Sequence, residues 1–217
     1  AAEQQQQHHQ RDDDDQQNND ENRAHTTVGG EAHQNREGQE LGELLELIPL
    51  GAGSEVGRSC VVASFFEGKK NVMFDCGIHP GFSGLSSLPY FDEIDVSAID
   101  VLLVTHFHLD HCAAVPFLVN RTNFKGRVFM THATKAIFHM LMSDFVRLSA
   151  RQQPKAKGSE EKEEEEDESQ LWDAKDLKAA MDKIEVIDFH QEINIDGIKV
   201  TPYRAGHVLG ACQFEVN

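Results

Sequence analysis

Four side chains that can bind a metal lie within six consecutive residues near the middle of this 217-residue chain. The segment is His106-Phe107-His108-Leu109-Asp110-His111. Imidazole nitrogens and carboxylate oxygens are ligands that zinc takes in catalytic sites, where one position stays open for water. In an extended segment His106 and His108 point the same way, so both can reach one metal. A turn at Asp110-His111 can reach a second. The spacing therefore predicts two adjacent metal ions and a hydrolytic reaction.

Two residues elsewhere in the chain are candidates to complete this site. His207 follows an expected strand; alone it would be interpreted as a turn histidine, but beside the first segment we expect a third ligand for the metal of His106 and His108. Asp75 also follows an expected strand. Its carboxylate either orients the ligand loop or caps a turn, and the sequence favours neither interpretation.

Apolar runs with strand and helix character alternate through the second part of the chain, which predicts a layered α/β fold. The metal-binding segment directly follows one such run, and Asp196-Gly197 is typical of a hairpin turn. The expected strands cover residues 46–50, 59–66, 71–74, 99–104, 127–130, 184–187, 198–203 and 211–216, and the expected helices cover 112–119, 134–148 and 173–182.

Composition divides the chain into unlike parts. Residues 1–45 are rich in Gln, Asn, His and Asp and have few aliphatic side chains, so we expect a disordered tail. Residues 160–168 contain eight acidic side chains and one lysine, which predicts a solvated, acidic low-complexity insertion at about 151–170. The remainder of 46–217 is expected to be one incomplete domain.

The net charge of −17 is unevenly distributed. Residues 1–46 carry an excess of nine acidic side chains, whereas residues 47–150 carry an excess of only one. Nucleic acids are bound mainly by Lys and Arg, so an evenly acidic protein would be a poor RNA partner. Because the first folded stretch is close to neutral, the total charge does not exclude an RNA substrate.

Cysteine usage and hydropathy indicate a cellular compartment. The four cysteines lie far apart beside apolar or small residues, so we expect buried free thiols and a reducing environment; they are Cys60, Cys76, Cys112 and Cys212. The N-terminus lacks a signal pattern and no apolar run is long enough for a bilayer, so we expect no membrane association. The absence of an initiating Met leads us to expect a fragment.

Several segments, in this order, resemble the β-CASP branch of the metallo-β-lactamase superfamily: Gly51-Ala52-Gly53, Asp75-Cys76-Gly77, residues 106–111 and Gly206-His207. The residues at 78–81 and 124–127 are most similar to the corresponding residues of endonucleases that process pre-mRNA 3′ ends. The resemblance extends over about residues 47–216. It implies the α/β, αββα layered fold of metallo-β-lactamases, of which this chain would be the N-terminal portion only.

The resemblance also implies the site and its reaction. His106, His108 and His207 would hold one zinc ion. Asp110, as a ligand and catalytic residue, would hold the second zinc with His111, while Asp75 would orient the ligand loop. The two zinc ions would activate water to cut single-stranded pre-mRNA in the nucleus, together with other subunits of the cleavage and polyadenylation complex. The family completes its site with residues after Asn217, so we expect no nuclease activity from this fragment alone.

Other functions are compatible with the same metal-binding segment. A paralogous Integrator-type RNA endonuclease shares most of these motifs, and a glyoxalase-like hydrolase of small molecules uses a similar loop. A non-catalytic scaffold subunit of the same complex is a further alternative. Scaffold subunits usually lose metal ligands, whereas all five expected ligands are present here, so we favour the enzyme.

Overall fold

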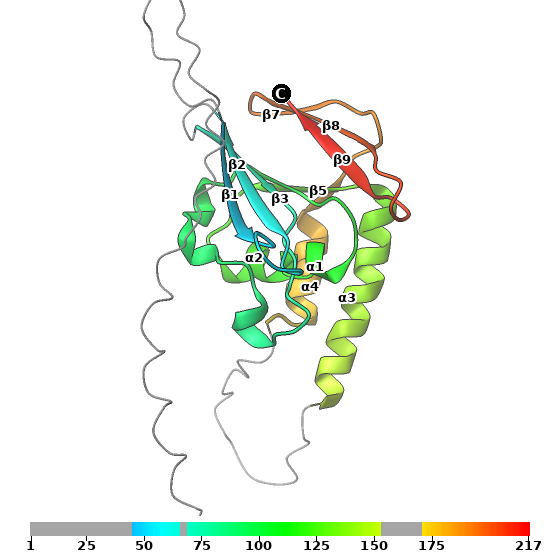
Figure 1. The fold of residues 1–217 in the computed structure, drawn as a ribbon. Coiled ribbons are helices and arrows are strands. Elements are labelled where there is room, and N and C mark those ends of the chain that lie inside the picture. Colours follow the sequence, from blue (N-terminus) through cyan, green and yellow to red (C-terminus); the bar gives the residue numbers. More distant parts are fainter. Residues whose placement is uncertain (1–44, 66–68, 153–170) are drawn as a thin grey trace, which may run out of the picture.

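The computed structural model describes residues 45–65, 69–152 and 171–217, which form two β-sheets and a group of helices (Figure 1). The strands are β1 (Leu45–Gly51), β2 (Cys60–Phe65), β3 (Lys70–Phe74), β4 (Val101–Leu103), β5 (Arg127–Met130), β6 (Ile184–Val186), β7 (Ile193–Ile195), β8 (Ile198–Arg204) and β9 (Cys212–Val216). The α-helices are α1 (Leu109–Cys112), α2 (Val115–Arg121), α3 (His132–Gln152) and α4 (Ala174–Lys183), and three short 3-10 helices cover Gly84–Ser87, Phe91–Glu93 and Val96–Ala98.

The larger sheet has the strand order β1-β2-β3-β4-β5-β6, and the smaller has the order β7-β8-β9. In the larger sheet β1, β2 and β3 pair antiparallel, and β3 to β6 pair parallel. Helical segments make the crossovers that the parallel pairs require. In the smaller sheet both pairs are antiparallel, and Asp196-Gly197 forms the turn between β7 and β8, as the sequence predicted.

Two apolar clusters on opposite faces of the larger sheet create the layers. Met73 and Leu102 belong to the cluster shared with the helices. Their strand neighbours Val72, Val101 and Leu103 pack instead against apolar residues of the smaller sheet. Because successive strand residues point to opposite faces, β3 and β4 are apolar on both sides. The order helices, larger sheet, smaller sheet confirms the layered α/β prediction (Figure 1); an outer helical layer over the smaller sheet is not among the described residues.

Several expected boundaries were wrong. The single helix expected at 112–119 is two helices, α1 and α2, which meet at Ala113-Ala114. Pro116 lies in the first turn of α2, where its missing N–H costs no hydrogen bond. Strand β7 was not expected, because its three residues contain only two apolar side chains and give too short a pattern.

The limits of the tail and the insertion also need correction. Leu45, assigned to the tail, already belongs to β1, and Arg151 and Gln152, assigned to the insertion, are the last residues of α3. Residues 1–44 and 153–170 lie outside the described ranges. All four cysteines are buried and free, which confirms that part of the prediction. None of the described helices combines the length and the apolar character needed to cross a bilayer.

The site residues lie where the parallel strands end. Asp75 directly follows β3, His106 lies three residues after β4, and Thr131 directly follows β5. The carboxyl ends of neighbouring parallel strands lie at one edge of a sheet, where α/β proteins commonly bind ligands. His207 comes from the loop between β8 and β9 in the other sheet. The two sheets therefore approach each other at this edge.

Backbone hydrogen bonds fasten the segment after β3 to the metal-binding segment. The amide of Cys76 donates to the His111 carbonyl at 2.8 Å, and the amide of Ile78 donates to the Leu109 carbonyl at 3.1 Å. Between them lies Gly77, where a Cβ atom would be 1.7 Å from the Asp110 carbonyl oxygen. No side chain fits at that distance, so only glycine allows the two segments this contact.

We expect Gly77→Ala to lower the free energy of unfolding by at least about 3 kcal/mol, because the two backbones must separate to admit a methyl group. Gly53→Ala is the matched control, since a Cβ there would meet Pro49 at an ordinary 3.6 Å. We expect the control to stay within about 0.5 kcal/mol of the wild type. Urea unfolding followed by circular dichroism measures both; equal stability of the two variants would contradict this packing.

Candidate metal centre

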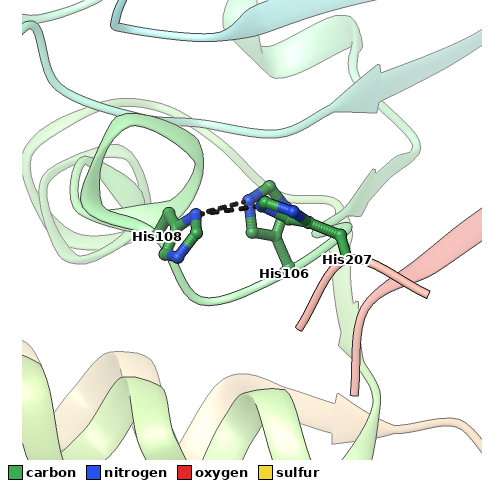
Figure 2. A group of neighbouring side chains, drawn as sticks. All are labelled: His106, His108 and His207. Atoms are coloured by element: carbon green, nitrogen blue, oxygen red, sulfur yellow. Dashed lines mark hydrogen bonds between the residues drawn. The ribbon is translucent and has the colours of Figure 1, made fainter. Parts of the chain in front are cut away.

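Three imidazole rings from two separate parts of the chain point toward one another (Figure 2). His106 and His108 extend from the segment after β4, and His207 extends from the loop between β8 and β9. One nitrogen from each ring lies within 4.8 Å of the other two. Burial falls across the group, from buried His106 through half-buried His108 to exposed His207. The group is therefore open to solvent on one side, which leaves room for a water or a substrate.

The distances between the nitrogens fit one zinc ion. His108 Nδ1 lies 3.1 Å from His106 Nε2 and 3.3 Å from His207 Nε2. Two ligands of a tetrahedral zinc ion, with zinc–nitrogen bonds of about 2.0–2.1 Å, lie about 3.3 Å apart. An imidazole Nδ1–H can donate one hydrogen bond at a time, so hydrogen bonding alone does not explain both approaches to His108. Three unprotonated nitrogens facing a shared cation would explain both.

A hydrogen-bond relay sets the tautomer of His106. Its Nδ1 lies 2.9 Å from the Thr105 hydroxyl, and that hydroxyl donates to Asp75 Oδ2 at 3.0 Å. Since the Thr105 hydroxyl donates its proton to Asp75, the Thr105 oxygen accepts a hydrogen bond from His106 Nδ1–H. His106 Nε2 then carries a lone pair toward His108 and His207. Thr105 was not predicted from the sequence, although a hydroxyl directly before a candidate ligand is the available signal for this role.

Asp75 contacts both halves of the metal-binding segment. Its Oδ1 accepts from the Thr105 amide at 2.8 Å, and its Oδ2 accepts from His111 Nδ1 at 2.7 Å as well as from the Thr105 hydroxyl. The residue is buried and has a φ of 61°, a left-handed conformation that aspartate tolerates better than most residues. Of the two interpretations left open by the sequence, these contacts match the one in which Asp75 orients the ligand loop.

Asp110 and His111 lie beside the three histidines. Because His111 Nδ1 is bonded to Asp75, its Nε2 is left for a metal, and this atom lies 3.6 Å from Asp110 Oδ2. The rings of His106 and His111 are 4.1 Å apart between centroids, so His111 lies directly beside the three histidines. Within the described ranges, the only group of three or more potential metal ligands is His106, His108 and His207. Asp110 and His111 therefore form a pair of potential ligands next to that group.

The surroundings of buried His106 and half-buried His111 affect their protonation in opposite directions. Burial, reinforced by the charge on nearby His111, lowers the pKa of His106 to about 4, so the ring is neutral near pH 7 and can bind a cation. Burial also disfavours protonation of His111, but the hydrogen bond and charge of Asp75 outweigh it and raise the pKa. A metal at His111 must therefore displace a proton more often than one at His106.

Comparison with known proteins finds both a family and close relatives. A family model described as a metallo-beta-lactamase superfamily domain matches residues 66–217. The chain is 56% identical over 176 residues to cleavage and polyadenylation specificity factor subunit 3-I of Arabidopsis thaliana, 54% identical over 174 residues to endoribonuclease ysh1 of Schizosaccharomyces pombe, and 48% identical over 191 residues to cleavage and polyadenylation specificity factor 73 of Drosophila melanogaster.

These matches cover most of the chain but a small part of each relative. They include 81%, 80% and 88% of this chain and 23%, 21% and 25% of the respective relatives. The similarity to proteins of pre-mRNA 3′-end processing, expected from the sequence motifs, is confirmed at this level. The family match includes the metal-binding segment, Asp75 and His207. The chain belongs to the metallo-β-lactamase superfamily.

Proposed function

We propose that this chain is part of a zinc-dependent endoribonuclease that cuts pre-mRNA at the site of 3′-end processing. The observation that carries the proposal is the convergence of three imidazole nitrogens beside the pair Asp110 and His111. The relatives named as endoribonucleases, and as subunits of a cleavage and polyadenylation factor, support RNA as the substrate. The chain spans about a quarter or less of their length, so the rest of the protein would complete the enzyme.

Each side chain of the centre has a distinct task in this proposal. His106 Nε2, His108 Nδ1 and His207 Nε2 would hold one zinc ion, and Asp110 with His111 would hold part of a second. Two such ions lower the pKa of a water and stabilise the attacking and leaving oxygens of an in-line displacement at phosphorus. Asp75 would keep His111 and, through Thr105, His106 in the tautomers that present Nε2.

The proposed substrate and partners follow from the same relatives. Single-stranded pre-mRNA would be the substrate, other subunits of the cleavage and polyadenylation complex would be the partners, and the nucleus would be the location. All five proposed ligands are present in the sequence, which argues against a non-catalytic scaffold subunit. A small-molecule hydrolase would not explain the identity of about half of all aligned residues to the 3′-end-processing proteins.

We expect His108→Ala in the full-length protein to reduce RNA cleavage by more than about 100-fold, because His108 Nδ1 is the nitrogen that lies close to both other ligands. The fold should persist, since His108 is only half-buried. His139→Ala, on the exposed surface of α3, is the matched control and should cleave normally. Cleavage of a labelled pre-mRNA measures both. Wild-type activity in His108→Ala, or a wild-type protein without zinc, would refute the proposal.

A second variant tests the task of Asp75. Asp75→Asn keeps the shape but removes the charge that accepts from Thr105 and His111, so we expect zinc affinity to fall about 10- to 100-fold. Asp95→Asn is the control, because Asp95 accepts from Ser97 in its own turn and has no hydrogen bond to Thr105 or His111 among the described residues. Competition with a zinc-binding dye gives the affinities. Unchanged zinc affinity in Asp75→Asn would contradict this task and would mean that Asp75 only stabilises its turn.

A further inference from the structure

The loop that carries His207 is exposed but ends in a buried glycine. Residues 205–207 and Leu209 are exposed, whereas Gly210 and Ala211 are buried. An exposed histidine has few packing contacts to fix it, yet His207 Nε2 lies 3.3 Å from His108 Nδ1. The position of His207 must therefore be set where its loop returns to the core, three residues later.

Two buried threonines meet the loop at that point. The Thr131 hydroxyl donates to the Gly210 carbonyl at 2.7 Å, and the Thr134 hydroxyl lies 3.2 Å from the same oxygen. The two hydroxyl oxygens are 2.9 Å apart, and both side chains are at most 3% exposed. A buried carbonyl that loses such donors is left without a replacement from water. These bonds therefore tie the loop directly to the segment after β5.

Thr131 also belongs to the start of α3. Its hydroxyl accepts from the Thr134 amide at 3.3 Å, and its carbonyl accepts from the Lys135 amide at 2.9 Å, as in an N-terminal helix cap. The same hydroxyl thus accepts from the helix and donates to the loop. As a result, the orientation of α3 and the place of the loop depend on one side chain.

Because Gly210 has no side chain, the loop can lie directly against the two threonines. The φ of Gly210 is 82°, which favours glycine, and a Cβ atom would lie 2.8 Å from Thr131 Oγ1 and 2.9 Å from both Ala133 Cβ and the Thr134 amide nitrogen. A side chain at 210 would push the loop away from the threonines. Close contact and hydrogen bonding therefore occur at the same residue.

We propose that Thr131 and Thr134 are positioning residues for His207: they hold Gly210 so that His207 Nε2 reaches the metal bound by His106 and His108. This inference rests on the metal centre of the proposed function. It adds the contacts that position the third proposed ligand, His207, which comes from the smaller sheet. The loop is also linked to the ligand segment at Cys212, whose amide and thiol donate to the Thr105 carbonyl at 3.0 and 3.5 Å. The threonines add a second fixed point, so that the loop cannot pivot about Cys212.

The test compares zinc affinity with stability in the full-length protein. Thr131→Val and Thr134→Val each keep the side-chain shape but remove the hydroxyl, and we expect a roughly 10-fold or greater loss of zinc affinity. Thr131→Ser retains the hydroxyl and should stay within about 2-fold of the wild type. Asp173→Ala removes the cap of α4, far from the loop in the chain, and should lower the melting temperature without changing zinc affinity.

Zinc competition titrations and thermal unfolding by circular dichroism are measured on all variants. Wild-type affinity in both valine variants would overturn the proposal, and so would an equal loss in Asp173→Ala, which would make the effect one of stability alone. If Thr131→Val does not fold, Thr134→Val decides, because its hydroxyl is not the helix cap. The titration requires no RNA, so a zinc-binding protein that fails to cut RNA would refute the proposed function and not this one.

Discussion

The buried carboxylate of Asp75 is the contact on which the geometry of the whole centre depends. Its oxygens accept from the Thr105 amide and hydroxyl and from His111 Nδ1, so one side chain contacts His111 directly and His106 through Thr105. A buried charge is tolerated when such donors surround it. The left-handed backbone at Asp75 is the local cost of placing the carboxylate there, and residues in such conformations concentrate at functional sites.

The architecture explains why these groups can meet. The parallel strands β3, β4 and β5 end at one edge and deliver Asp75, the metal-binding segment and Thr131 side by side. The smaller sheet packs on the opposite face from the helices through its own apolar cluster, which brings the β8–β9 loop to the same edge. Burial of apolar surface between the sheets thus positions a loop whose tip, with His207, is itself exposed.

The sequence predicted those parts of the molecule that short segments encode. The candidate ligands from His106 to His111 are close together in the chain, and most strands have clear apolar patterns, so both could be predicted from the sequence. Strand β7 and the break at Ala113-Ala114 could not, because three residues or two alanines carry too little pattern. Thr131 and Thr134 act through contacts with Gly210, 79 and 76 positions away, and nothing in the local sequence indicates such contacts. Thr105 was indicated only by its place directly before His106.

We propose that His106 Nε2, His108 Nδ1 and His207 Nε2 bind one shared metal ion. Anomalous diffraction at the zinc edge, from crystals of the purified full-length protein, tests it most directly. We expect a peak about 2.0–2.1 Å from His106 Nε2, His108 Nδ1 and His207 Nε2, and a second peak beside Asp110 and His111. Zinc bound elsewhere, or a peak that His207 does not contact, would contradict the claim.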